Sequence, residues 1–168
     1  LTLKPTLYCA NVAEKDLPGG GKYVDLVRQH AAKEGADVVV ISGKVESELI
    51  DLSEEDQQVF LKDLGLEEPG LNSLIRAGYK TLQLITYFTA GEKEVRAWTV
   101  RKGSKAPQAA GVIHSDFERG FIRAEVMRYE DLVKYGSQPA VKEKGLLRVE
   151  GKEYETQDGD VMLFRFSV

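Results

Sequence analysis

The first forty residues alternate between strand-like and helix-like spacing of their apolar positions. Residues 3–10 form a strand-like apolar run, and Pro-Gly-Gly-Gly at 18–21 ends the loop that follows it. Apolar side chains then recur at helical spacing as far as Gly35, a typical helix stop, at Tyr23, Leu26, Val27 and Ala31. Residues 37–42 are again β-rich. The order strand, loop, helix, strand predicts half of a parallel α/β layer.

Two amphipathic helices are predicted next. Ser53 is followed by three acidic residues, which is a good helix start because serine can cap the helix and the acids lie where the helix dipole favours them. Pro69 marks the start of a second helix, with apolar positions at Leu71, Leu74, Ile75 and Leu82. We interpret this pair of helices as the connection between two domains.

From Ile85 onward the apolar period changes to two. Residues 86–89 and 95–100 flank the turn-like residues 90–93, which predicts a β-hairpin. The pattern then predicts a short helix, a strand, a helical turn or two and three short strands, at 107–114, 121–127, 129–134, 146–149, 154–157 and 161–166. Two strands, a helix and several short strands is the order of a ubiquitin-like β-grasp.

Composition narrows the classes of partner. The chain has 168 residues, 42% of them apolar, and a formal net charge of −4, so it can build a core but has no bulk electrostatic attraction to polyanions. We expect no DNA specificity and no membrane partner. The charge is uneven, because residues 1–84 hold nine Lys and Arg against 14 Asp and Glu, whereas residues 85–168 hold 14 against 13. The second half is therefore the better candidate for contact with a polyanionic partner.

A cytoplasmic location fits the remaining features. Cys9 is the single cysteine, so no disulfide framework exists, and its apolar neighbours suggest a core thiol. The longest aliphatic run, residues 38–41, is far shorter than a membrane helix, and the start lacks a signal pattern. Because the chain opens with Leu1 rather than Met and enters a strand pattern almost at once, we expect it to be the rear part of a longer protein.

Two short polar motifs follow the first two predicted strands. They are Asn-Val-Ala-Glu at 11–14 and Ser-Gly-Lys at 42–44, and an open parallel sheet binds its ligand at the carboxyl ends of its strands. In GTP-binding P-loop proteins an Asn-Lys-x-Asp motif in this place reads guanine, its Asp accepting hydrogen bonds from N1–H and the exocyclic amine. We predict a nucleotide base pocket formed by Asn11, Val12, Glu14, Ser42, Gly43 and Lys44.

The motif departs from the guanine-reading form in two ways. The lysine that would stack on the base is absent, and the carboxylate of Glu14 sits one methylene further out. Adenine has no N1–H, so an aspartate held there would face the lone pair on N1 and be repelled. A longer or displaced acid avoids this repulsion and so removes one obstacle to adenine binding. This chemistry predicts weakened guanine specificity. Asn-x-x-Glu is also an ordinary loop and helix-cap sequence, so a chain without a nucleotide role stays an alternative.

The sequence resembles the YchF, or Obg-like, ATPases, a branch of the Obg-related P-loop NTPases, over essentially its whole length. Residues 11–16 resemble the altered base motif of that family. The short sequence segments that resemble its TGS domain lie in order at residues 88–91, 94–99, 101–103, 106–111, 113–114, 116–118 and 120–122. The resemblance implies residues 1–84 as the last part of an Obg-type P-loop NTPase domain with a helical connection, and residues 85–168 as a β-grasp TGS domain. The expected fold class is thus α/β plus α+β.

The resemblance also implies a function. Members of this family bind and hydrolyse ATP as well as or better than GTP, use Mg²⁺ and associate with ribosomes. The present sequence contains no G-x-x-x-x-G-K-[ST], no switch segments and no helical insertion ahead of the base motif. We therefore expect ATP or GTP with Mg²⁺ only in an intact protein, and we assign no catalytic and no metal-binding residue to this chain.

The second half carries a candidate RNA contact. No acidic residue lies between Val95 and Ser115, and this stretch holds Arg96, Trp98, Arg101, Lys102 and Lys105. A hairpin with basic and aromatic side chains can neutralise phosphates and stack on bases, so we predict an RNA or ribosome contact there. The alternatives stay open: basic residues on a strand are usually a solvated face, and Trp98 is equally suited to a half-buried core position. A chain that is only an RNA- or protein-interaction module is the competing hypothesis.

Overall fold

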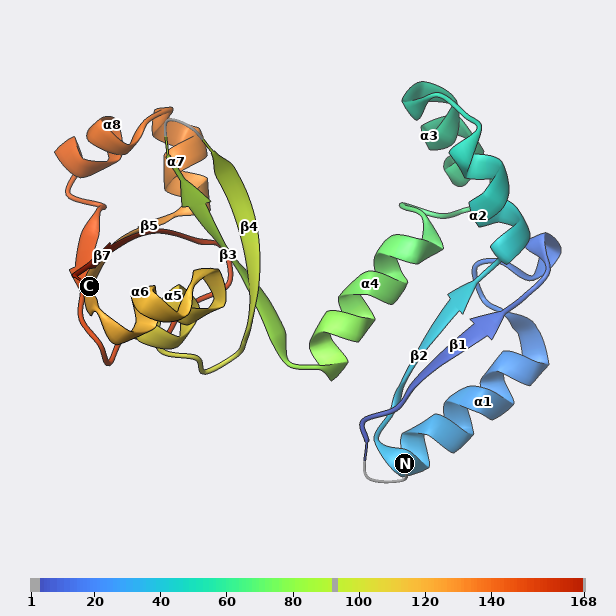
Figure 1. Cartoon of the computed structure of the whole chain (residues 1–168). Coiled ribbons are helices and arrows are strands. Elements are labelled where there is room, and N and C mark those ends of the chain that lie inside the picture. The colour runs from blue at the N-terminus through green and yellow to red at the C-terminus, as the bar shows by residue number, and fades with distance from the viewer. Residues whose placement is uncertain (1–3, 92–93, 168) are drawn as a thin grey trace. The chain divides into compact units, whose positions relative to one another are not determined.

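The computed structural model describes residues 4–91 and 94–167 and shows a mixed α/β chain (Figure 1). The chain divides into two compact units, the first ending at Leu82 and the second beginning at Gln83. Each unit has its own sheet, of two strands in the first and five in the second.

The first unit is built on a parallel strand pair. Strands β1 (Leu7–Asn11) and β2 (Asp37–Ile41) pair in parallel and are joined by the short 3-10 helix η1 (Glu14–Asp16) and by helix α1 (Gly21–Glu34). Gly35 ends α1 at φ +66°, which confirms the predicted helix stop, since few residues other than glycine adopt this conformation easily. Helices α2 (Gly43–Ile50), α3 (Glu54–Asp63) and α4 (Gly70–Thr81) complete the unit.

The helix signals in the first unit are confirmed in detail, and the strand prediction in part. The Ser53 side chain accepts a hydrogen bond of 3.2 Å from the Asp56 amide and so caps α3. Pro69 directly precedes α4. The first strand starts at Leu7, so residues 4–6 are not part of it, and residue 3 lies outside the described residues.

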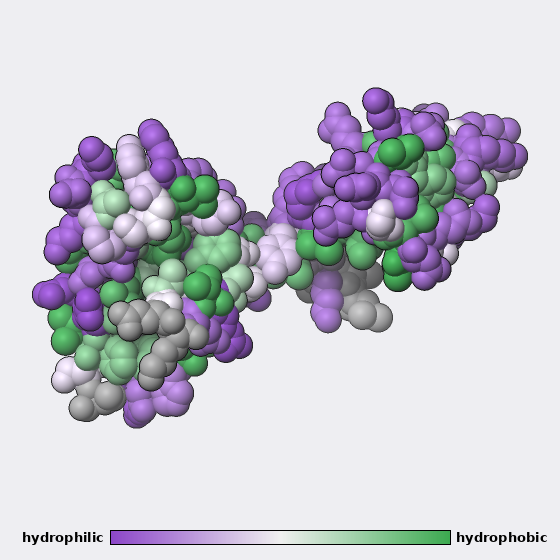
Figure 2. Space-filling model, turned by 90° about the horizontal axis from the view of Figure 1, so that it is seen from above, coloured by the Kyte–Doolittle hydropathy of each residue, from purple (hydrophilic) through white to green (hydrophobic). Residues whose placement is uncertain are grey.

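Several apolar side chains of the first unit are not buried. Its buried cluster consists of Val45, Leu49 and Leu61, with partly buried neighbours, and lies on α2 and α3. By contrast Tyr23 of α1 is 75% exposed. The prediction that Cys9 is a core thiol is wrong, because Cys9 is exposed on β1, a strand with a neighbour on one side only. Hydrophobic residues are visible at the surface of both units in Figure 2.

The second unit is a five-stranded mixed sheet with helices. Its strand order is β4-β3-β7-β5-β6, in which β3 and β7 pair in parallel and the other pairs are antiparallel. The hairpin of β3 and β4 is confirmed, although residues 92–93 of its turn lie outside the described residues. The elements are β3 (Leu84–Ala90), β4 (Val95–Arg101), α5 (Ala106–Ile113), α6 (Ser115–Arg119), β5 (Phe121–Arg128), α7 (Tyr129–Tyr135), α8 (Gln138–Glu143), β6 (Arg148–Glu150) and β7 (Asp160–Phe166).

A continuous core holds this sheet to α5. Tyr87 of β3 is completely buried, and its hydroxyl donates a hydrogen bond of 2.7 Å to the Ala109 carbonyl of α5. Tyr87 is one of ten buried residues that form a single cluster, and these residues come from β3, β4, β5, β7 and α5. A second, smaller cluster buries Met127, Val141 and Val161 beneath α7 and α8.

One predicted strand of the second unit is wrong. Residues 154–157 are not a strand: they lie between two turns, at 152–153 and 158–159, and Glu155 among them forms an isolated bridge to Lys105. The backbone amide of Gln157 donates to the Asp160 carboxylate at 2.9 Å, and this bond closes the turn at 158–159 that ends the segment. The short helices α6 and α8 were not expected from the apolar pattern, because each is only one to two turns long.

Candidate functional site

A hollow of about 570 Å³ opens at the carboxyl ends of β1 and β2. It is lined by residues from both motifs that follow these strands, together with two neighbours: Asn11, Val12, Ala13, Glu14, Lys15, Ser42, Lys44 and Leu64. The Val12 amide donates to the Ile41 carbonyl at 2.8 Å, so the loop after β1 is fastened to the end of β2. The structure therefore brings together the two motifs that the sequence places 30 residues apart, as the parallel pairing requires.

Asn11 joins the two motifs directly. Its side-chain oxygen accepts a hydrogen bond of 2.9 Å from the Gly43 amide, the first residue of α2. With the oxygen committed to the protein, the carboxamide NH₂ is the group that remains to donate to a ligand. A β-carbon added at Gly43 would lie 3.6 Å from this Asn11 oxygen, an ordinary contact, so the protein itself has room for a side chain there.

Glu14 does not face the hollow as a free carboxylate. Its Oε2 lies 3.1 Å from Lys44 Nζ, and the same ammonium lies 3.5 Å from Glu48 Oε1, one turn further along α2. The hydrogen bond from Lys44 to Glu14, with the charge of Glu48 next, raises the pKa of the Lys44 ammonium above its usual value. Lys44 is therefore charged at neutral pH and neutralises part of the acid beside the hollow.

Ser42 contributes a buried hydroxyl. The residue is 1% exposed, and within residues 4–91 and 94–167 its Oγ has no hydrogen-bond partner. It precedes α2 as the N-cap residue, but its side chain does not cap the helix. A buried hydroxyl without a partner is costly, so this atom favours a polar ligand or a water molecule at the edge of the hollow.

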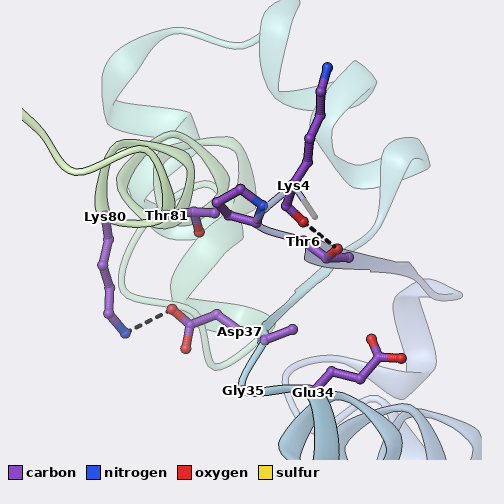
Figure 3. Close-up of a pocket in the computed structure, with 9 residues that line it drawn as sticks. Lys4, Thr6, Glu34, Gly35, Asp37, Lys80 and Thr81 are labelled. Carbon is purple, nitrogen blue, oxygen red and sulfur yellow. Dashed lines mark hydrogen bonds and ion pairs between the residues drawn. The ribbon is translucent and has the colours of Figure 1, made fainter. Parts of the chain in front are cut away.

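A second hollow, of about 640 Å³, lies at the opposite, amino-terminal ends of the two strands (Figure 3). Its side chains carry both signs of charge, and Lys80 of α4 pairs with Asp37 of β2 at 2.7 Å. Glu34 accepts a hydrogen bond of 2.7 Å from the Tyr8 hydroxyl. Because these groups pair with one another, they attach α1 and α4 to the strand pair. They do not converge on a space that a ligand could occupy.

In the second unit, Arg96 and Trp98 lie on one face of β4, as the alternation predicts. The Arg96 guanidinium stacks 4.1 Å from the centre of the Trp98 ring, and the Trp98 indole N–H donates to the Thr89 hydroxyl at 2.9 Å. Trp98 is only half-buried, yet one ring face is covered and its N–H is used. A base could stack on this face only after Arg96 moves away.

The remaining basic residues of this stretch differ in their surroundings. Lys105 pairs with Glu153, and its backbone amide donates to Gln108 at the start of α5. Arg101 and Lys102 are exposed at the end of β4, and no ion pair of theirs is found among the residues that the structure describes. Of the five predicted contact residues, these two offer the most accessible positive charge.

Sequence reasoning missed Glu46. This residue of α2 accepts hydrogen bonds from the backbone amides of Gly70 at 2.8 Å and Leu71 at 3.3 Å, and so caps the start of α4. No local pattern could have revealed it, because the acceptor lies 24 residues before the helix that it caps. Glu46 therefore connects α2, which begins at the hollow, to α4, the last helix of the first unit.

Two absences bear on the chemistry. Among residues 4–91 and 94–167, no cluster of three or more His, Cys, Asp or Glu side chains could hold a metal ion. Within the same residues, no helix is both long and apolar enough to cross a membrane.

Comparison with known proteins gives a consistent result. A family model named YchF-GTPase_C, described as a protein of unknown function (DUF933), matches residues 84–167. The chain is 56% identical over 170 residues to the "Ribosome-binding ATPase YchF" of Bacillus subtilis, and 59% identical over 168 residues to the protein of the same name from Haemophilus influenzae. Each alignment covers 100% of this chain and 46% of the relative, so the chain spans about half the length of these proteins.

Solved structures show the same relationship. The structure of the YchF GTPase of Schizosaccharomyces pombe matches 96% of this chain and 43% of that chain, with a TM-score of 0.85 and 39% sequence identity. A GTP-binding protein from Pyrococcus horikoshii matches 98% of the chain with a TM-score of 0.67, but at 20% identity it shows likeness of fold alone. On the family model, the relatives and the fold together, the chain belongs to the YchF family.

Proposed function

We propose that this chain is the carboxyl-terminal part of a ribosome-binding nucleotide hydrolase, in which the first unit supplies the base pocket for ATP or GTP. The observation that carries the proposal is the 2.9 Å hydrogen bond between Asn11 and Gly43, which holds the two motifs around one hollow. Relatives named ribosome-binding ATPases support the nucleotide and the ribosome as partners.

The expected contacts to the base follow from the polar groups of the hollow that remain available to a ligand. The Asn11 NH₂ is suited to donate to N7, an acceptor that adenine and guanine share, so it secures a purine without choosing between the two. The buried Ser42 hydroxyl and the start of α2 at Gly43 lie at the same edge of the hollow. Selection between the bases falls to Glu14, which is the acidic side chain that lines the hollow.

Phosphates and Mg²⁺ belong to another part of the protein. The described residues offer no cluster of metal ligands, and the sequence has no phosphate-binding glycine-rich loop, so the residues of this chain do not fit the metal. ATP or GTP hydrolysis would need the half that the relatives have and that this chain does not contain. A cytoplasmic location is proposed on the strength of the ribosome partner.

We also propose that residues 1–84 are a partial P-loop NTPase domain. Parallel sheets are normally covered on both faces and continue over several strands, whereas within the described residues β1 and β2 pair with each other and with no third strand. On α1 and α4, which pack on these strands, Leu26 is 57% exposed and Leu71 is 51% exposed. Uncovered apolar surface beside an open strand pair is what a sheet lacking its other strands would leave.

For residues 85–168 we propose a TGS domain of β-grasp type that contacts RNA or the ribosome. The order of a hairpin, a helix and further strands, with parallel β3 and β7 inside the sheet, supports this fold. Arg101 and Lys102 are the side chains best placed for phosphate contacts. We expect their joint replacement by alanine to weaken ribosome co-sedimentation about tenfold at low salt, and less at high salt, because phosphate contacts depend on salt.

The base pocket is tested by restoring the missing half. This chain would replace the matching carboxyl-terminal part of the Bacillus subtilis relative, and ATP and GTP affinities would be measured with and without Asn11→Ala. Loss of one hydrogen bond to the base predicts about tenfold weaker binding of both nucleotides. Equal affinities for the two forms would sink the base pocket and favour the competing function, an interaction module without a nucleotide role.

A further inference from the structure

The ion pair between Lys44 and Glu14 involves the acid that, in the proposed pocket, would distinguish the two purines. Glu14 is the acid of the hollow, and Lys44 Nζ lies 3.1 Å from its Oε2. On this geometry we propose that Lys44 is a positioning residue for base selectivity: it holds the Glu14 carboxylate away from the base and so lets the pocket accept adenine. The inference rests on the proposed base pocket and adds a residue that decides which purine is favoured.

The chemistry of the two bases gives the direction of the effect. A free carboxylate would accept hydrogen bonds from N1–H and the 2-amino group of guanine, and it would oppose the N1 lone pair of adenine. A carboxylate already paired with an ammonium has less charge to offer guanine and repels adenine less. Pairing with Lys44 therefore weakens the binding of guanine and strengthens that of adenine, and both effects lower the preference for guanine.

Contacts on two sides fix the position of Lys44. It is the second residue of α2, and the first, Gly43, is bound to Asn11 in the loop that also carries Glu14. Glu48 lies four residues further along the same helix and holds the ammonium from the other side at 3.5 Å. The hydrogen bond to Glu14 is the main cause of the raised pKa of Lys44, so the ammonium keeps its proton throughout the neutral range.

Exposure limits the size of the effect. The Lys44 side chain is 68% exposed and that of Glu14 is 39% exposed, so water screens the pair. We therefore expect a change in the ratio of guanine to adenine affinity of about three- to fivefold. The effect should shrink as salt is added, since ions screen exposed pairs.

The test uses the 168-residue chain with AMP and GMP, which differ only in the base. Nuclear magnetic resonance titrations would follow the backbone amides of Asn11 and Gly43. Lys44→Ala should raise the ratio of GMP to AMP affinity about three- to fivefold, and Lys44→Arg, which keeps the charge, should restore the original ratio. Lys22→Ala is the matched control, because it removes one positive charge from α1, outside the lining of the hollow, and should leave the ratio unchanged.

A double-variant cycle separates positioning from a structural role. In a Glu14→Gln background the carboxylate is gone, so Lys44→Ala should no longer change the ratio. An effect that persists in this background, or a ratio that does not respond to Lys44→Ala at all, overturns the inference. The base pocket is tested separately: if Asn11→Ala abolishes the response to both nucleotides, the proposed pocket is supported, whatever the effect of Lys44→Ala. If neither nucleotide shifts these amides, the pocket and the inference both fall.

Discussion

The two sheets of the molecule differ in how completely they are covered. In the second unit, β3, β7 and β5 each have a strand on both sides, and the sheet carries Tyr87, Val126 and other side chains that are completely buried. In the first unit β1 and β2 have one neighbour each, and the helices beside them leave Tyr23 and Ile75 at least half exposed. The second unit buries its sheet with its own strands and helices, whereas the first leaves its strand pair less covered, as we would expect if it were one side of the larger sheet proposed above.

Separating the units should reveal this difference most strongly. We expect residues 83–168 alone to unfold cooperatively at the same urea concentration as in the whole chain, because their core is their own. Residues 1–82 alone should unfold at much lower urea, with several kcal/mol less stability. Circular dichroism and amide hydrogen exchange of the two fragments check this. A first unit as stable as the second would refute the view that it is one side of a larger sheet.

Within the second unit, Tyr87→Ala should have the largest effect of a single substitution. It empties a completely buried site and leaves the Ala109 carbonyl without its 2.7 Å hydrogen bond. The expected cost is about 3–5 kcal/mol. Urea unfolding followed by fluorescence of Trp98, the single tryptophan, measures it. Tyr129→Ala, at a 50% exposed position, should change stability by much less, and similar losses for both would show that the core is not where we place it.

Local signals in the sequence predicted much of both units. Period-two spacing predicted the β3–β4 hairpin, and Ser53 and Gly35 predicted helix ends, because each signal acts through neighbouring residues. The failures depend on distant partners. Cys9 was expected in a core, but whether a strand is buried depends on which other strands flank it. Residues 154–157 look strand-like, yet they form one isolated bridge and lie between two turns, the second of which is held by the Asp160 carboxylate.

The same limit applies to the candidate site. The sequence places Asn11, Glu14 and Lys44 at strand ends, and the parallel pairing brings them together as predicted. It could not show that Lys44 pairs with Glu14, because that contact depends on the angle at which α2 leaves β2. Nor could it show that Arg96 lies over Trp98 rather than leaving that ring open. Spacing therefore identifies which residues meet, but not which of them remain available to a ligand.

Alkaline pH should weaken the second unit through Tyr154. Burial, followed by the hydrogen bond to Asp160, raises the pKa of the Tyr154 hydroxyl to about 12. Below pH 10 both states keep this proton, whereas between pH 10 and about 12 mainly the unfolded state loses it, so stability falls in that window. Because of the 2.7 Å bond to the Asp160 carboxylate, we expect wild type to be more stable than Tyr154→Phe by about 1 kcal/mol at pH 8.

This advantage should shrink as the pH approaches 12, where the wild-type hydroxyl ionises. Urea unfolding of both forms at a series of pH values, again read by Trp98 fluorescence, gives the difference directly. A gap that stays constant from pH 8 to 12 would contradict the assignment to Tyr154. Such a result would leave Tyr87, whose pKa burial also raises, as the tyrosine responsible for any alkaline loss.

The smallest predicted effect tests whether the first unit responds on its own. Ser53→Ala removes the hydrogen bond that caps α3 and should cost that unit about 1 kcal/mol, detected as faster amide exchange in α3. Ser47→Ala is the matched control, because its hydroxyl donates to the Lys44 carbonyl within α2 and its loss should be nearly neutral. The Trp98 transition should be the same in both variants, since that residue reports on the other unit. If Ser53→Ala also shifted the Trp98 transition, the two units would unfold together and the contrast between their sheets would not extend to their stability.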